Sequence, residues 1–273
     1  MSDATPSHLQ GYIDTWWQAV GDLADLADSL TDEDWSRPTD LPGWDVRAVL
    51  SHVAHLEGVL GGAPREHAEV GELEHVRGPM GQFTEIGVLT RRDTPPSEIV
   101  AQIRSYAAAR HDDLVADPPT DPAAKAPGLF GAIGWDTARL LRNRPLDVWM
   151  HEQDVRRAVG RPGGLDSLGA EHATTYLLES LGYVLAKRAG AAPGTTVVAH
   201  VEGSTPAAYG VAEDGRGHRL DTPPATSTVS LRMGRETFIR LAGGRGVVDP
   251  AEVMIEGDIP LGEKVVAHLA VTP

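Results

Sequence analysis

The chain has 273 residues, a formal net charge of −15 and no cysteine. This length exceeds the usual size of a single hydrophobic core, so two domains are expected. The negative charge disfavours nucleic acid and anionic membranes as partners, and the lack of cysteine excludes disulfides and thiolate metal ligands. Any thiol chemistry must therefore use a thiol supplied by a small molecule.

The sequence carries no sign of a membrane or export segment. Residues 1–6 lack the basic start and the apolar core of a signal peptide. No apolar run approaches ~18 residues, the length that a membrane-spanning helix needs. We therefore expect a cytoplasmic protein that neither crosses nor binds a membrane.

The first part of the chain is predicted to be helical. Apolar residues recur at helical spacing over 8–30. A second helix is expected after Asp45, a good N-cap residue that follows a loop rich in proline and glycine. Residues 65–92 are interpreted as a helix interrupted by glycines, and residues 94–114 as a more regular helix. This pattern is typical of a helical bundle.

A further helix is expected after the Pro- and Gly-rich loop over 117–134. It is predicted to begin near Pro145, because proline suits the first turn of a helix, and to end at Gly160. The stretch 160–164 is the best candidate for a hinge. A bundle of four or more helices is therefore predicted for residues 1–163.

Residues 164–273 alternate between helical and strand patterns. Strands are predicted where β-branched residues alternate, and helices where apolar residues recur every third or fourth position. The expected elements are a helix over 166–189, strands over 195–201, 209–211, 227–231 and 253–258, and helices over 236–241 and 261–269. The chain is thus predicted to be an α+β protein with two domains, of which the C-terminal one is smaller.

A carboxylate and an imidazole lie four residues apart in the helix predicted after Pro145. Asp147 and His151 therefore share one helical face, one turn apart. His52 lies on the earlier helix that follows Asp45. Two histidines and a carboxylate from two helices would form a catalytic metal site, with positions left for water and substrate. The spacing alone also fits a carboxylate favoured by the helix dipole beside a half-buried histidine.

Nitrogen and oxygen donors suit Zn²⁺, which we prefer, and also Ni²⁺ or Mn²⁺. His55, three residues after His52, is a further candidate ligand or else a partly exposed surface histidine. Glu152 is expected to be solvated. Asp154 is a candidate for a residue that supports the ligands from outside.

Three segments carry a recognisable pattern: residues 38–52 (PTDLPGWDVRAVLSH), residues 144–160 (RPLDVWMHEQDVRRAVG), and residues 238–245 together with 255–258. The first two resemble the DinB-like, mycothiol-dependent maleylpyruvate isomerase family. The third is similar to the C-terminal sterol-carrier-like domain of that family. The segments occur in the family's order and cover both ends and the middle of the chain.

The resemblance implies a DinB-like four-helix bundle that binds a divalent metal, followed by a smaller α/β sterol-carrier-like domain. It places the metal ligands at His52, Asp147 and His151, although the family more typically has glutamate where this chain has Asp147. It implies mycothiol as the thiol, a small electrophile as the second substrate, and either S-transfer or cis–trans isomerisation. The family's catalytic arginine falls on Arg245, with Arg240 as the alternative.

Two residues of the second segment are predicted to contact the thiol or the substrate. Arg144 would neutralise an anionic group, and Trp149, together with Trp44, would form a pocket wall, although core packing is the favoured alternative for both tryptophans. Two other function classes stay open: a non-catalytic module that binds a small ligand, and a metal-dependent hydrolase that activates water. We expect a monomer or a homodimer that binds no nucleic acid.

Overall fold

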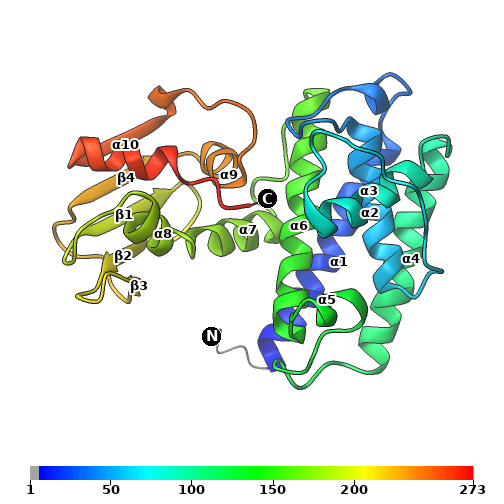
Figure 1. Cartoon of the computed structure of the whole chain (residues 1–273), viewed down its shortest axis with the longest axis horizontal. Coiled ribbons are helices and arrows are strands. Elements are labelled where there is room, and N and C mark those ends of the chain that lie inside the picture. The colour runs from blue at the N-terminus through cyan, green and yellow to red at the C-terminus, as the bar shows by residue number, and fades with distance from the viewer. Residues whose placement is uncertain (1–5, 273) are drawn as a thin grey trace. The chain divides into compact units, whose positions relative to one another are not determined.

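A computed structural model describes residues 6–272 of the chain. It divides into two compact units, of which the first ends at Gly164 and the second begins at Leu165. The first unit is helical and the second combines helices with a sheet (Figure 1). The α+β layout with two domains that the sequence predicts is therefore confirmed.

Four long helices form the bundle of the first unit: α1 (Pro6–Asp28), α2 (Val46–Leu60), α4 (Pro96–Ala116) and α6 (Thr137–Val159). Helix α1 packs against α4 and α6, and α2 packs against the same two helices, so the four enclose one core (Figure 1). Its largest fully buried side chains include Trp16, Leu50, Ile103 and Trp149. Shorter elements complete the unit: the 3-10 turn Asp34–Ser36, α3 (Gly78–Thr90) and α5 (Gly128–Ala132).

Side-chain caps fix where helices α2 and α6 begin. Asp45 accepts a hydrogen bond of 2.8 Å from the backbone N–H of Ala48 at the start of α2, as the sequence predicts. Asp136 caps α6 in the same way through the N–H of Arg139. The prediction that α6 begins near Pro145 is therefore wrong, because the capping signal lies nine residues earlier. Pro145 lies inside the helix, where it removes one backbone hydrogen bond.

Residues 65–92 also differ from the prediction. Only α3 is helical there, and it starts at Gly78 with a proline in its first turn. Residues 65–73 have no regular structure. Gly78 and Gly81 lie inside α3, so these glycines do not interrupt a helix as the sequence predicts.

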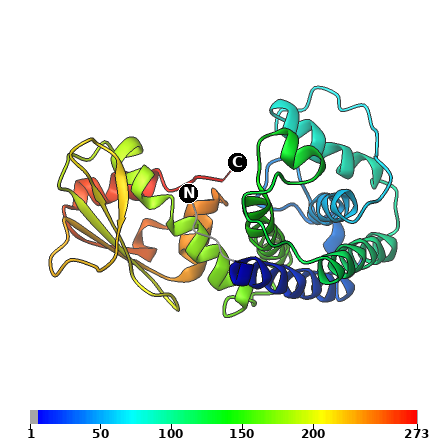
Figure 2. The same ribbon diagram turned by 90° about the horizontal axis from the view of Figure 1, so that it is seen from below.

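The second unit contains a five-stranded sheet in the order β3-β2-β1-β4-β5. Its strands are β1 (Thr196–Val201), β2 (Ala207–Val211), β3 (Gly217–Leu220), β4 (Val229–Met233) and β5 (Val253–Gly257). Strands β1 and β4 run parallel, and the other neighbouring pairs are antiparallel. Figure 2 shows the strands of this unit in a second view. Strand β3 was not predicted, because its side chains are largely exposed and show no apolar alternation.

The helices of the second unit are α7 (Leu168–Leu178), α8 (Leu181–Tyr183) with the π-helical turn Val184–Arg188, α9 (Arg235–Gly243) and α10 (Ile259–Ala267), with the 3-10 turn Pro250–Glu252 before β5. The single helix predicted over 166–189 is therefore broken between α7 and α8. Helix α8 packs on β2 and β3, and α10 packs on β4 and β5.

Within residues 6–272, no helix combines the length and the apolar character needed to cross a membrane. Residues 1–5, to which the argument against a signal peptide refers, lie outside the described residues.

Candidate metal centre

The three predicted metal ligands lie together at the contact between α2 and α6. His52 lies in the middle of α2, and Asp147 and His151 are one turn apart on α6. The Nε2 atom of His52 is 3.9 Å from Oδ2 of Asp147, and Nε2 of His151 is 3.8 Å from Oδ1. One donor atom from each residue lies within 4.8 Å of the other two. The histidine rings meet edge to face, with centroids 4.9 Å apart.

These separations fit a shared cation better than mutual hydrogen bonds. Both exceed the range of a hydrogen bond. Two donors that each lie about 2.1 Å from a tetrahedral ion are about 3.4 Å apart, so a small movement of the side chains completes the contacts. The Nδ1 atom of His52 is buried and has no hydrogen-bond partner in the described part of the chain. The donor set, two imidazoles and a carboxylate, therefore suits a divalent cation.

His151 is oriented by a carboxylate on the opposite side of its ring. Oδ2 of Asp154, one turn further along α6, lies 3.1 Å from Nδ1 of His151. Asp154 is fully buried, and its other oxygen accepts a hydrogen bond from Arg157. A carboxylate at Nδ1 fixes the ring so that Nε2 points at the ligand group, and it raises the basicity of that nitrogen.

Asp147 is held by Arg144, its neighbour one turn earlier. Nη1 of Arg144 donates to Oδ2 of Asp147 at 2.8 Å, and Nη2 donates to Oε1 of Glu57 at 2.6 Å. Only 1% of the surface of Arg144 is exposed. The predicted role of Arg144 in contacting an anionic substrate stays a prediction, since both of these nitrogens bind carboxylates of the chain.

Burial and charge set the protonation states of the group. Burial lowers the pKa of His52 to about 4, although the Asp147 carboxylate opposes this shift. Burial alone would raise the pKa of Asp147, but the positive charge of Arg144 and the interactions with His52 and His151 together outweigh it and hold the pKa well below its usual range. At neutral pH His52 is therefore a neutral imidazole and Asp147 a carboxylate, which are the forms that bind metal.

Trp44 lies against both histidines of the group. Its ring centroid is 5.0 Å from that of His52 and 6.2 Å from that of His151. The indole Nε1 donates to Oε2 of Glu85 at 3.0 Å, and Nε2 of His75 lies 3.2 Å from the same oxygen. Glu85 and His75 were missed in the sequence, because they are far from Trp44 along the chain and belong to no motif.

Gly43, just before Trp44, packs closely under His75. A Cβ atom at this position would lie 2.3 Å from the His75 ring, and the φ angle of +81° also favours glycine. The loop that carries His75 is therefore fitted to the backbone beside Trp44. This arrangement fixes one wall of the ligand group.

Trp149, Glu152 and His55, which lie near the three candidate ligands along the chain, are all buried. Trp149 is fully buried, and its Nε1 donates to the carbonyl of Gly164, so its predicted contact with a cofactor stays a prediction. The expectation that Glu152 is solvated is wrong, since it is 1% exposed and pairs with Arg156 at 2.7 Å. His55 is also buried, which corrects the surface alternative.

Arg245, the predicted catalytic arginine, lies in the second unit just after α9. It is 6% exposed, and its Nη1 donates to the carbonyl of Gly243. The alternative, Arg240, donates to the carbonyl of Val247 at 2.5 Å. The catalytic role of Arg245 therefore stays a prediction.

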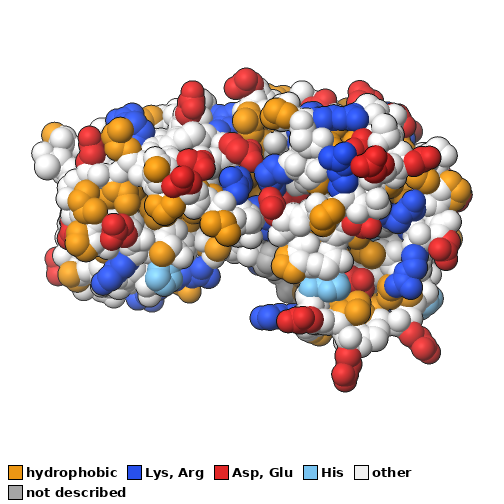
Figure 3. Space-filling model, turned by 90° about the horizontal axis from the view of Figure 1, so that it is seen from above, with side chains coloured by type: hydrophobic (Ala, Val, Ile, Leu, Met, Phe, Trp, Pro, Cys, Tyr) orange, Lys and Arg blue, Asp and Glu red, His pale blue; other side chains and the backbone are white. Residues whose placement is uncertain are grey.

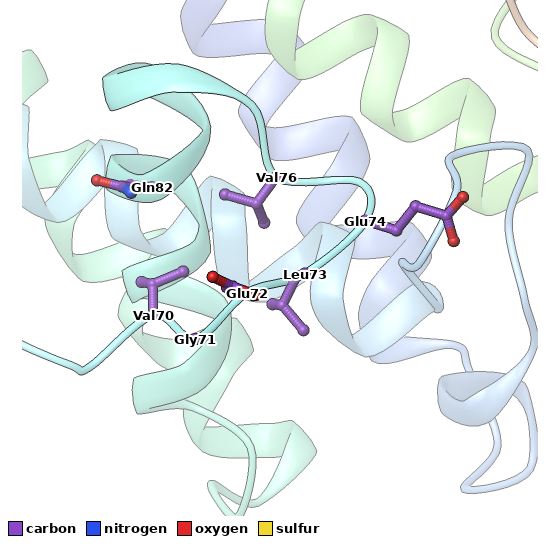
Figure 4. A pocket seen from close by; sticks show the side chains of 7 residues that line it. All are labelled: Val70, Gly71, Glu72, Leu73, Glu74, Val76 and Gln82. Atoms are coloured by element: carbon purple, nitrogen blue, oxygen red, sulfur yellow. The ribbon is translucent and has the colours of Figure 1, made fainter.

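A surface hollow of about 540 Å³ lies along the loop between α2 and α3. It is lined by Val70, Gly71, Glu72, Leu73, Glu74, Val76 and Gln82 (Figure 4). The Glu74 carboxylate extends away from the other labelled side chains. The hollow thus contains none of the three ligand residues, and its side chains do not converge on one point.

Charges of both signs are interspersed with apolar side chains on the face shown in Figure 3. A broad basic area of the kind that binds nucleic acid is not present on that face. This agrees with the net charge of −15.

A family model described as the mycothiol maleylpyruvate isomerase N-terminal domain matches residues 16–156. The match covers more than half of the chain and contains all three candidate ligand residues. The chain belongs to this family. Membership confirms the resemblance that the first two sequence segments carry.

Two uncharacterised proteins from two strains of Mycobacterium tuberculosis are 27% identical to the chain over 141 residues. The alignment covers 51% of this chain and 52% of each relative, so the chain spans about half the length of the curated relatives it matches.

Two solved structures share the fold over both units. They are the mycothiol-dependent maleylpyruvate isomerase, with a TM-score of 0.53 and 16% identity, and a mutant of it, with a TM-score of 0.56 and 15% identity. Each alignment covers 93% of this chain and 95% of the other. At this identity the likeness establishes the fold.

Proposed function

We propose that the chain is a divalent-metal-dependent enzyme that uses a low-molecular-weight thiol, mycothiol, against a small electrophile. The observation that carries the proposal is the convergence of His52, Asp147 and His151 inside a domain of this family. Three protein donors leave coordination positions for a thiol or water. Zinc is our first choice of metal, with nickel or manganese as alternatives.

The residues of the chain would divide the work as follows. The imidazoles of His52 and His151 and the carboxylate of Asp147 would hold the cation, and Asp154 would keep the ring of His151 in place. A bound cation would supply the charge that deprotonates a thiol at neutral pH. Because the chain has no cysteine, the thiol must come from outside.

Two outcomes follow from attack of the thiolate sulfur on the electrophilic carbon. If the thiolate displaces a leaving group, such as the chloride of monochlorobimane, the carbon–sulfur bond persists and the product is a conjugate. If it adds to a carbon–carbon double bond, the π electrons move to the neighbouring carbon, and rotation can occur about the resulting single bond. Expulsion of the thiolate then re-forms the double bond, and the net reaction is cis–trans isomerisation. Arg245 is proposed to bind a carboxylate or a developing negative charge of the substrate.

The proposal is tested by measuring bound metal in the purified protein and then turnover with and without mycothiol. Maleylpyruvate and a simple electrophile, monochlorobimane, are suitable substrates for the two outcomes. We expect one metal per chain and turnover that requires both the metal and the thiol. Metal-dependent turnover of an ester or amide without thiol would instead favour a hydrolase, and absence of metal would favour a binding module.

The role of Arg245 has its own test. Arg245→Ala should leave the metal content unchanged and lower turnover by roughly 30- to 1000-fold, the cost of one lost charge-assisted contact in the transition state. Arg245→Lys should rescue poorly, because a planar guanidinium pairs with a carboxylate through two hydrogen bonds. Arg240→Ala is the matched control. Full turnover of Arg245→Ala, or a larger loss in the control, would contradict the assignment.

A further inference from the structure

A line of buried charges runs from the candidate metal ligands into the core of the bundle. Arg144 lies between the Asp147 and Glu57 carboxylates and donates to both. Glu57 is fully buried on α2 and also accepts from Nε1 of Trp16 at 3.0 Å. Arg110 of α4 lies on the far side, with Nη1 3.8 Å from Oε2 of Glu57.

We propose that Glu57 is a positioning residue that tunes metal affinity by compensating the charge of Arg144. This inference rests on the proposed function, because it concerns the same metal group. Glu57 does not contact the ligand group itself. It acts through Arg144, which it holds in place against Asp147.

The position of Arg144 requires such compensation. Its guanidinium binds Oδ2 of Asp147, the same oxygen that lies 3.9 Å from His52. A cation held by Asp147 would therefore lie close to a second positive charge in a poorly solvated interior, where charges interact strongly. The negative charge of Glu57, 2.6 Å from Nη2 of Arg144, offsets that repulsion.

Geometry points the same way. Arg144 is 1% exposed, so no solvent can replace Glu57 as the acceptor for Nη2. Trp16 holds Glu57 in turn through the hydrogen bond from its Nε1 atom. Removal of the Glu57 charge would therefore leave the positive charge of Arg144 less compensated and would weaken the hydrogen bond that holds its Nη2 atom in place.

A charge-compensating role and a purely structural role predict different signs for a double substitution. Glu57→Gln leaves the charge of Arg144 uncompensated, so metal affinity should fall. Adding Arg144→Gln to that variant removes the excess positive charge, so affinity should recover. If Glu57 served only packing, the second substitution would remove another buried contact and the two losses would accumulate.

The test is the Zn²⁺ dissociation constant, measured by competition with a chromophoric chelator, for the full chain and its variants. We expect Glu57→Gln to weaken Zn²⁺ binding by about 10- to 100-fold. The double variant should bind Zn²⁺ about tenfold more tightly than Glu57→Gln. Glu66→Gln is the matched control, because Glu66 pairs with Arg91 and not with Arg144. A cooperative thermal unfolding transition in each variant serves as the control that it is folded.

A second variant keeps the test decisive if Glu57→Gln does not fold. Arg110→Gln removes a positive charge that contacts none of the three ligand residues, and it should strengthen Zn²⁺ binding by about three- to tenfold. Unchanged or weaker binding in Arg110→Gln, or a double variant that binds no better than Glu57→Gln, would overturn the inference. A wild-type chain that binds no Zn²⁺ would instead overturn the proposed function.

Discussion

Two clusters that each include a histidine of α2 and a carboxylate differ in whether the histidine is hydrogen-bonded to that carboxylate. The ligand group contains His52, Asp147 and His151, whose donor atoms converge at 3.8–3.9 Å without hydrogen bonds between them. The second cluster, which we call the Glu66 clamp, contains His55, Glu66, Thr90 and Arg91. There Glu66 accepts from His55 at 3.0 Å, from Thr90 at 2.8 Å and from both terminal nitrogens of Arg91.

The difference is the one expected between a metal-binding group and a structural one. In the Glu66 clamp the carboxylate is saturated by donors, so it ties the loop after α2 to α2 and α3. In the ligand group the histidine nitrogens face the carboxylate from beyond hydrogen-bond distance, which leaves their lone pairs for an ion. His52 and His55 lie three residues apart on one helix, so their surroundings rather than their sequence positions decide their roles.

The largest expected contrast comes from paired histidine substitutions. His52→Gln should abolish stoichiometric metal binding, because one of three protein ligands is lost. His55→Gln should retain it, because His55 belongs to the Glu66 clamp. Metal content after dialysis against one equivalent of Zn²⁺ measures both. Equal metal retention in the two variants would remove the distinction between the clusters.

A smaller effect on Zn²⁺ affinity is expected at Asp154, which contacts His151 but not the metal position. Asp154→Asn keeps the shape of the side chain but loses the charge that orients His151, so Zn²⁺ affinity should fall by about 10- to 100-fold. Chelator competition gives the affinity. Glu152→Gln, two residues earlier on α6, is the control, since Glu152 pairs with Arg156 instead. An affinity loss as large in the control would show that α6 is disturbed as a whole.

The smallest expected effect is on stability, in the Glu66 clamp. Burial alone would raise the pKa of Glu66, but hydrogen bonds from His55 and Arg91 hold that pKa well below its usual value of 4.5. A depressed pKa in the folded state adds stability above the unfolded value, and this stability declines as the pH falls below it. Glu66→Gln should therefore lower the melting temperature at pH 7, with a difference that shrinks below about pH 4.5. A constant difference between pH 7 and pH 3 would contradict the clamp.

The sequence predicted that His52, Asp147 and His151 lie together, because local spacing and a family pattern carry that grouping. Asp147 and His151 share a face wherever their helix begins, so the wrong start near Pro145 did not affect them. Asp45 gave the start of α2 correctly, since a cap is a local signal. The resemblance then paired the two helices, which spacing alone left open.

The remaining features depend on contacts that no local pattern encodes. Glu57 and Arg144 are 87 positions apart, and their pairing follows from how α2 packs on α6. Glu85 reaches Trp44 across 41 positions in the same way. Glu152 looked exposed because a charged residue usually is, but its pairing with Arg156 permits burial.

The most direct test of the metal centre is X-ray absorption at the zinc edge of the Zn²⁺-loaded chain, before and after addition of mycothiol. We predict two imidazole nitrogens with oxygen ligands at about 2.0–2.2 Å, and then a new sulfur ligand at about 2.3 Å. Because the chain has no cysteine, a thiolate ligand must come from the added thiol. A spectrum without imidazole ligands, or one that mycothiol leaves unchanged, would contradict the account.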